Sequence, residues 1–108
     1  MNGMASLQWQ YHGPIAIDQI ALKAKLAAIG FELESSDFES GFILALASPR
    51  KKYARESLSI LIAWSPKRLD GFLVEVRSRE PQKTTKRSQA DLLSEILKKD
   101  LPGVLKCP

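Results

Sequence analysis

The 108-residue sequence has few of the residues on which catalytic sites are usually built. It contains one cysteine, Cys107, and one histidine, His12. A single cysteine excludes an internal disulfide, which fits a reducing compartment. Cys107 is next to the last residue and His12 lies at the end of a predicted strand, so we do not expect them to form a nucleophile–base pair. We therefore assign no catalytic residue and expect a protein that is not an enzyme.

The sequence also lacks the patterns that bind metals, phosphates and membranes. The carboxylates at positions 32, 34, 37 and 39 do not form a calcium-loop signature, and the six glycines are dispersed at turns. No apolar run approaches the ~20 residues of a membrane-spanning helix, and the N-terminus has no basic-then-apolar signal pattern. We expect no metal, no cofactor, no membrane association and a cytoplasmic location.

What the sequence does contain is the composition of one ordinary globular domain. Hydrophobic residues make up 44% of the chain and charged residues 26%. A chain of this length can bury roughly two-thirds of its unfolded surface. Without repeats, low-complexity stretches or linkers, the sequence predicts a single domain over residues 1–108, with residues 1–5 and 104–108 frayed.

The clearest element is a β-hairpin within residues 56–87. Apolar residues at every second position of 58–64 and 72–76 predict two strands that each bury one face. Between them SPKRLDG forms a turn, in which Asp70-Gly71 supplies a residue that tolerates positive φ. One register makes every apolar residue face another apolar residue. It places Trp64 opposite Phe72, Ile62 opposite Val74, Ile60 opposite Val76, Ser59 opposite Arg77 and Ser57 opposite Arg79.

A strand and a helix are predicted before this hairpin. Residues 6–12 alternate apolar and polar side chains, and Gly13-Pro14 ends that strand. Residues 17–29 are helical, with Asp18 as N-cap and Gly30 as the stop. The apolar residues of this helix cover more than a narrow stripe, so we expect it to be well buried. They form two ridges: Ile17, Ile20, Ala24 and Ala28, and Leu22, Leu26 and Ile29.

A second hairpin and a second helix complete the predicted elements. Residues 31–35 and 42–47 pair around SDFESG, with Leu33 opposite Leu44 and Phe31 opposite Leu46. A helix follows Ser88, which lies at capping-box spacing from Asp91. Its predicted buried face contains Leu92, Leu93, Ile96 and Leu97, and Pro102-Gly103 is expected to stop it.

Together these elements predict an α+β fold of two layers. The order β-α-β-β-β-β-α favours a mainly antiparallel sheet of about five strands with two helices on one face. The sequence does not determine the position of the first strand within the sheet. A position beside the fifth strand would keep the sheet wholly antiparallel.

Charge is distributed unevenly along the chain, which has a net charge of +4. Residues 1–47 carry two lysines against five acids, whereas residues 48–108 carry fourteen basic residues against seven acids. In a meander, the loop after the third strand and the exit from the fifth lie at the same end of the sheet. The predicted binding residues at this basic edge are Arg50, Lys51, Lys52, Tyr53, Arg55, Arg77, Arg79, Lys83, Lys86 and Arg87. Lys67 and Arg68 belong to the opposite end, so the polarity is incomplete.

Three interpretations of the basic edge stay open. It can bind an acidic protein partner, or it can bind nucleic acid weakly and without sequence preference, with Tyr53 stacking on a base. It can also be ordinary solvated surface. Specific nucleic-acid recognition is not expected, because the sequence has no aromatic pair of the RNA-recognition type, no helix-turn-helix and no zinc-finger spacing.

The predicted sheet face away from the helices is a second candidate surface. Serine, glutamine and arginine mixed with two leucines are typical of a modest protein-binding face, although an ordinary solvated face has a similar composition. Its predicted members are Ser57, Ser59, Leu61, Ala63, Leu73, Glu75, Arg77 and Arg79, joined by Gln8, Gln10 and His12 if the first strand keeps its own alternation.

The stretch VEVRSREP, residues 74–81, resembles a strand-to-loop motif of a group of small uncharacterised cyanobacterial proteins. The resemblance extends over the C-terminal third of the chain. It implies no activity, cofactor or binding residue, but it favours a cytoplasmic bacterial accessory protein.

The expected function is that of a non-enzymatic binding or assembly module. Such a module would engage an acidic protein partner through the basic sheet edge, and weak nucleic-acid binding through the same edge is the alternative. The sequence leaves the oligomeric state open, since an exposed second or fifth strand is able to pair with a strand of another molecule.

Overall fold

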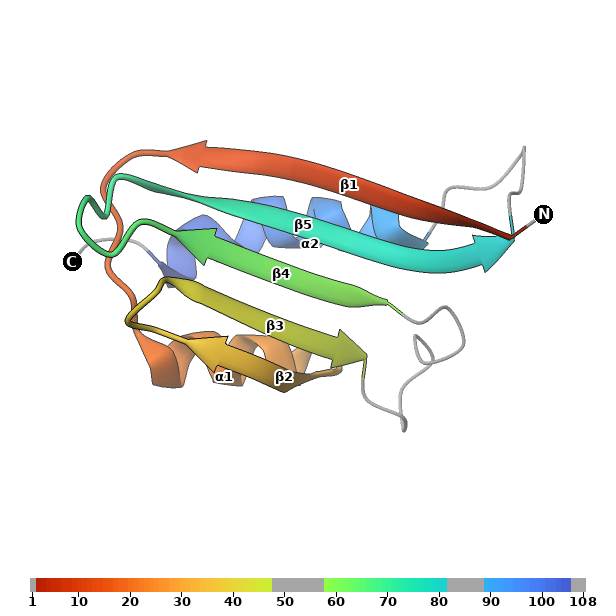
Figure 1. The fold of residues 1–108 in the computed structure, drawn as a ribbon, viewed down its shortest axis with the longest axis horizontal. Coiled ribbons are helices and arrows are strands. Elements are labelled where there is room, and N and C mark those ends of the chain that lie inside the picture. The colour runs from red at the N-terminus through yellow and green to blue at the C-terminus, as the bar shows by residue number, and fades with distance from the viewer. Residues whose placement is uncertain (1, 48–57, 82–88, 106–108) are drawn as a thin grey trace.

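The described residues of the computed structural model form five strands and two helices, which confirms the predicted α+β class (Figure 1). The structure describes residues 2–47, 58–81 and 89–105, and the side chains of 6–46, 58–77 and 91–105. The elements are β1 (Asn2–His12), α1 (Gln19–Ala28), β2 (Phe31–Asp37), β3 (Phe42–Ala47), β4 (Ser59–Trp64), β5 (Gly71–Pro81) and α2 (Gln89–Val104).

The five strands form one antiparallel sheet in the order β1-β5-β4-β3-β2. β1 therefore lies beside β5, at one border of the sheet. Both helices cover the same face, α1 behind β2 and β3 and α2 behind β5 (Figure 1). The core lies between these layers, and its buried side chains include Leu22, Leu26, Phe31, Ile43, Ile60, Ile62, Val74, Val76, Leu93, Leu97 and Leu101.

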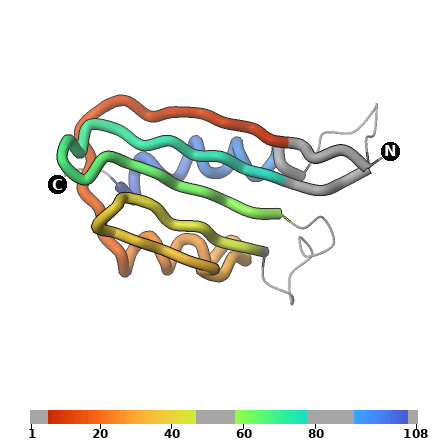
Figure 2. Tube along the Cα trace, in the orientation of Figure 1, coloured from red at the N-terminus to blue at the C-terminus, as the bar shows by residue number. Residues whose placement is uncertain are grey.

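The connection from β1 to α1 crosses one end of the sheet, as the chain trace in Figure 2 shows. Three backbone hydrogen bonds anchor this connection, two to the β4–β5 turn and one to the residue that follows α2. Gly13 N–H donates to the Asp70 carbonyl at 2.9 Å, and Ile15 N–H donates to the Leu69 carbonyl at 3.0 Å. Ala16 N–H donates to the Leu105 carbonyl at 2.9 Å, so the end of α2 is attached to the same connection.

The predicted register of the β4–β5 hairpin is confirmed. Trp64 pairs with Phe72, Ile62 with Val74, Ile60 with Val76 and Ser59 with Arg77; Ser57 lies outside the described residues. The turn differs in one detail from the prediction. The residue with positive φ is Leu69, at 45°, rather than one of Asp70-Gly71. Gly71 is required for close approach, because a Cβ there would lie 2.3 Å from the Tyr11 carbonyl oxygen.

The predicted register of the β2–β3 hairpin is wrong by one residue. Leu33 pairs with Ala45, a bulge follows between Leu33 and Ser35, and Ser35 pairs with Leu44. The pairing of β3 with β4 explains the difference. It places Ile43 opposite Ile62 and Ala45 opposite Ile60, so the odd-numbered residues of β3 face the core and Leu44 faces outward.

Helix α1 begins as predicted but is less buried than its composition suggests. The Asp18 side chain accepts a hydrogen bond from Ala21 N–H at 3.0 Å, and Gly30 has a φ of 93° just beyond the helix. Within the helix the buried residues are Leu22 and Leu26, whereas Ile20 is 82% exposed. The expectation of a well-buried helix is therefore wrong: Ile20, Ala24 and Ala28 of one ridge are exposed, and of that ridge Ile17, which precedes the helix, packs against the core.

Helix α2 continues past the predicted stop at Pro102-Gly103 and ends at Val104. Packing explains the extension, because Leu101 and Leu105 are both fully buried and Leu105 N–H donates to the Leu101 carbonyl at 3.0 Å. Of the predicted buried face, Leu93 and Leu97 are buried, whereas Leu92 and Ile96 are 40% and 38% exposed.

Asp37 closes the β2–β3 hairpin with hydrogen bonds to both of its carboxylate oxygens. Oδ1 accepts from the backbone N–H groups of Glu39 and Ser40, each at 3.1 Å, and Oδ2 accepts from the Ser40 hydroxyl at 2.9 Å. The backbone N–H of Ser40, followed by its hydroxyl, holds the pKa of Asp37 below its ordinary value.

The Asp37 carboxylate is expected to stabilise the fold at neutral pH and to lose that effect in acid. Because its pKa is lower in the folded chain, its contribution is complete above the unfolded value of about 3.9 and is lost as the pH falls through the lower folded value. Asp37→Asn keeps one oxygen acceptor and removes the charge. Urea titrations should show wild type more stable than this variant at about pH 7, with the difference shrinking below about pH 4. An equal difference at both pH values would contradict the prediction.

Candidate protein-binding surface

The sheet face away from both helices is not covered by any described element, and it faces the reader in Figure 1. Strand register places the predicted open-face residues there. Gln8 lies opposite Glu75 and Gln10 opposite Leu73 on one side of β5, while Leu61 and Ala63 lie opposite the same two residues on the other side. His12 is opposite Gly71, and Arg77 lies between Ser6 and Ser59. The prediction that β1 keeps its own alternation therefore agrees with the structure.

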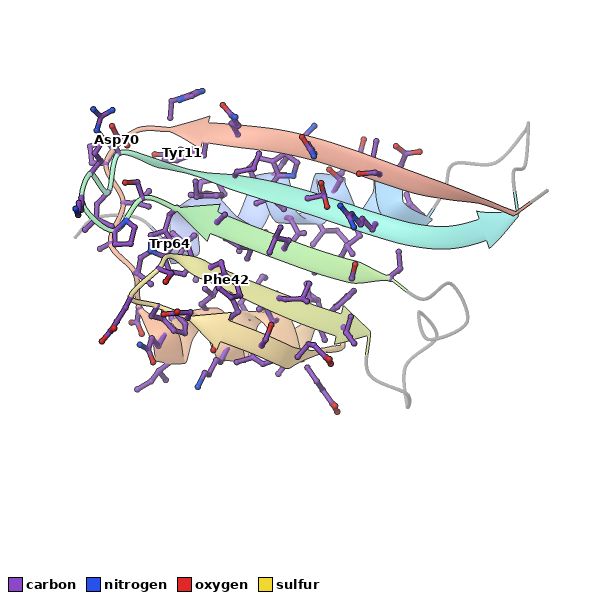
Figure 3. The ribbon with its side chains drawn as sticks, viewed as in Figure 1. Tyr11, Phe42, Trp64 and Asp70 are labelled. Atoms are coloured by element: carbon purple, nitrogen blue, oxygen red, sulfur yellow. The ribbon has the colours of Figure 1, made fainter. Side chains whose placement is uncertain are left out.

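An apolar patch occupies the middle of this face. We define it as Phe42, Leu44, Leu46, Leu61, Ala63 and Leu73. Its members are neighbours by register: Phe42 lies opposite Ala63, which lies opposite Leu73, and Leu44 lies opposite Leu61. Figure 3 looks onto the patch, with Phe42 on β3 near the end of β4 at Trp64. Each member is partly or well exposed, and Leu46 is 40% exposed.

Half of the apolar patch was missed by sequence reasoning. The predicted β2–β3 register paired Leu44 with Leu33 and Leu46 with Phe31, so it did not assign them to the open face, and Phe42 was left unassigned. A signal was present, because residues 42–47 are all apolar instead of alternating with polar residues. A short strand of this kind has apolar side chains on both faces, which indicates a second surface to cover.

Glu75 is the charged residue most deeply placed on this face, with only 7% of its surface exposed. Gln8 Nε2 donates to Glu75 Oε2 at 2.5 Å, and Arg77 Nε forms an ion pair with Glu75 Oε1. A buried carboxylate is costly unless its oxygens are paired, and here each oxygen has a partner. The Arg77 side chain is 56% exposed, so it is held at one nitrogen while much of it still faces solvent.

Most of the predicted basic edge lies outside the described residues. These are Arg50, Lys51, Lys52, Tyr53, Arg55, Lys83, Lys86 and Arg87, together with the side chain of Arg79. The structure does describe the strand ends that flank them. Because neighbouring strands are antiparallel, Ala47, Ser59 and Pro81 lie at one end of the sheet (Figure 1). Segments 48–57 and 82–88 are therefore attached to the same end, where β5 also carries Arg77.

The opposite end of the sheet has a shallow hollow beside the β4–β5 turn. Its lining includes Tyr11, His12, Asp70 and Leu73, and Figure 3 shows Tyr11 and Asp70 there. Tyr11 stacks on Phe72 at 5.2 Å between ring centroids, so this ring is engaged in packing. Within the part of the chain that the structure describes, no group of three or more His, Cys, Asp or Glu side chains is placed to hold a metal ion. The described helices include none that is long and apolar enough to cross a bilayer.

Comparison with known proteins adds no assignment. No protein-family model matches the chain, and no match was found among curated proteins or solved structures. The resemblance of residues 74–81 to small cyanobacterial proteins therefore stays a prediction, and function has to be argued from the surface.

Proposed function

We propose that this protein is a non-enzymatic binding or assembly module that holds an acidic protein partner against its open sheet face. The observation that carries the proposal is the apolar patch, which no described element covers. An apolar centre with polar residues around it is the usual anatomy of a protein–protein interface. Large contiguous apolar patches are uncommon on monomeric proteins unless something binds them.

Charge around the patch favours an acidic partner and one orientation of it. On β5 the patch member Leu73 is followed on the same face by the buried Glu75 and then by its ion-pair partner Arg77, which lies at the end of the sheet to which the basic segments 48–57 and 82–88 are attached. On the β2 side it ends at Glu32, which lies opposite Leu46. A partner with carboxylates beside an apolar stripe would place those carboxylates away from β2, because that strand is acidic overall.

The patch is expected to be required for partner binding, and Leu44 is the residue to change. Leu44 lies between Ser35 and Leu61, so Leu44→Gln removes apolar contact without adding charge or disturbing Glu75. Displayed random peptides would be selected on the full chain, and their affinity measured by fluorescence anisotropy. We expect peptides that combine Leu or Phe with Asp or Glu, bound at least about tenfold more weakly by Leu44→Gln.

Ile20→Gln is the matched control, because Ile20 is an 82% exposed apolar residue on α1, away from the open face. It should leave the affinity unchanged. If no acidic peptide is enriched, or if both variants bind alike, the proposal is wrong.

Nucleic-acid binding is the competing outcome and needs its own measurement. Fluorescent single- and double-stranded oligonucleotides would be titrated with the protein at two salt concentrations. Micromolar binding that falls steeply with salt and is unaffected by Leu44→Gln would replace the proposal with sequence-independent nucleic-acid binding. Absence of binding at low salt would exclude that alternative.

A further inference from the structure

The two border strands of the sheet differ in their protection against pairing with another strand. β2 has only seven residues and carries Glu32, Glu34 and Asp37. It also contains the bulge between Leu33 and Ser35. Short length, charged side chains and a bulge are the devices that natural proteins use to keep a border strand unpaired.

β1 has none of these devices. It is eleven residues long, NGMASLQWQYH, with no Lys, Arg, Asp, Glu or Pro. It pairs with β5 from Asn2 to His12 without a register shift, so its free border is regular as well. The sheet ends at β1, and no described element lies beyond it (Figure 1). A long, regular and uncharged border strand is a template for pairing with a further strand.

The free backbone groups of β1 belong to its even-numbered residues. In an antiparallel pair, alternate residues direct both backbone groups toward the neighbouring strand. Gly13 N–H donates to the Asp70 carbonyl of the chain leading into β5, which assigns the inward direction to odd residues. The N–H and C=O groups of Gln8 and Gln10 therefore point away from the sheet. They are positioned to form a second ladder.

We propose that β1 pairs with β1 of a second copy of this chain, antiparallel and across a twofold axis at Leu7, to form one ten-stranded sheet. Full overlap of residues 2–12 places Leu7 opposite Leu7 of the second copy. It also places Trp9 opposite Ala5 and Tyr11 opposite Gly3 of that copy. This register keeps odd residues opposite odd residues, so the helix-covered faces of both copies lie on the same side of the sheet.

Self-pairing is favoured over a foreign strand by the residue sizes along β1. Its two large aromatic residues come late in the strand, and the small residues Gly3 and Ala5 come early. An antiparallel copy therefore sets each large side chain against a small one, a pairing that pins strand register. No like charges meet, because the strand has no Lys, Arg, Asp or Glu.

This dimer does not depend on the proposed partner, since it uses the border of the sheet and not the apolar patch.

The first test is the mass of the full chain in solution, by light scattering over a concentration series. We expect a dimer for the wild type. Gln10→Pro removes an outward N–H while leaving the β5 ladder intact, because proline is tolerated on a border strand. Two symmetry-related hydrogen bonds are lost, so association should weaken by roughly thirtyfold. Gln10→Ala keeps the N–H and should remain as dimeric as wild type.

The second test reports the register directly. With Cys107→Ser as background, Leu7→Cys places two introduced thiols at the twofold axis, where facing Cα atoms of a non-hydrogen-bonded pair are about 4.5 Å apart and a disulfide can form. Gln10→Cys places its thiols roughly 20 Å apart, because position 10 lies opposite position 4. Mild oxidation should crosslink the first variant and not the second.

Three results would overturn the proposal. One is a wild type that stays monomeric up to about 100 µM, well above the dissociation constants of most specific dimers. Another is a dimer that Gln10→Pro does not weaken. The third is crosslinking of Gln10→Cys as efficient as that of Leu7→Cys. Circular dichroism of each variant checks that the fold is retained, and the wild-type mass does not depend on any variant.

Discussion

Gly41→Ala is expected to lower the free energy of unfolding by about 3 kcal/mol, because it combines backbone strain with a steric clash against β4. Gly41 has a φ of 87°, which costs a residue with a side chain about 1–2 kcal/mol. A Cβ there would lie 2.1 Å from the Trp64 carbonyl oxygen, a backbone atom that moves only with β4. The backbone strain at position 41 and the cost of displacing β4 therefore add.

The position of Gly41 explains why the chain cannot relax around an added methyl group. Its N–H donates to the Asp37 carbonyl at 2.8 Å, and its own carbonyl accepts from Trp64 N–H at 2.8 Å. The residue thus joins the β2–β3 hairpin to the end of β4. Moving it would break the bond that places Phe42 and the rest of the apolar patch beside β4.

Gly103→Ala is the matched control for this prediction. Gly103 lies in α2, and a Cβ there would meet no atom within 4 Å. Alanine favours the helix over glycine by about 0.5–1 kcal/mol, so this variant should be more stable than wild type. Urea unfolding followed by tryptophan fluorescence measures both variants. If Gly41→Ala costs less than about 1 kcal/mol, the close approach at Trp64 does not constrain the hairpin.

Strand register could be predicted from the sequence where one face is apolar and the other polar. The outward positions of β4 and β5 include the polar residues Ser59, Glu75 and Arg77, and only one register places Trp64 opposite Phe72 with every buried apolar pair matched. β3 is apolar on both faces, so its alternation gives no orientation. The bulge before Ser35 is a backbone feature without a glycine to mark it. Only pairing with β4, a contact between elements, decides which face of β3 is buried.

The helices also show which features could be predicted from the sequence and which depend on tertiary packing. Sequence located Asp18 and Gly30 at the ends of α1, because capping is a local interaction. It did not indicate that Ile20 is exposed, since alanine-rich helices have weak amphipathic patterns and the sheet decides which ridge packs. At the end of α2, burial of Leu105 outweighs the helix-breaking preference of Pro102.

The candidate surface was predicted in part for the same reasons. Alternation placed Leu61, Leu73 and Arg77 on the open face, and the strand pairs agree. The buried Glu75 carboxylate accepts a hydrogen bond from Gln8, and Gln8 lies on β1. The nearest residue of β1, His12, is 63 residues from Glu75 in the sequence. The position of β1 in the sheet therefore had to come from the structure. Its position at the border also determines which strand is free for self-pairing.

Arg77→Met is expected to destabilise the fold by about 2 kcal/mol, because it removes the cation paired with a buried carboxylate. The Glu75 side chain is 9% exposed and, of its two partners among the described residues, would keep the Gln8 amide. The full penalty for breaking a buried pair is larger, about 3–5 kcal/mol. We expect a smaller penalty here because the Arg77 side chain is 56% exposed, so water can solvate Glu75 when the guanidinium is removed.

A double-mutant cycle shows whether the ion pair is the cause. Glu75→Gln removes the buried charge, so the variant with both Glu75→Gln and Arg77→Met should recover most of the stability lost by Arg77→Met alone. Arg68→Met, in the exposed β4–β5 turn, controls for the loss of one positive charge and should change stability by less than about 0.5 kcal/mol. Equal losses in the single and double variants would show that Arg77 stabilises through packing alone. A measurable coupling energy would mean that Glu75 fixes the Arg77 guanidinium beside the apolar patch before a partner arrives, which lowers the entropic cost of binding a carboxylate there.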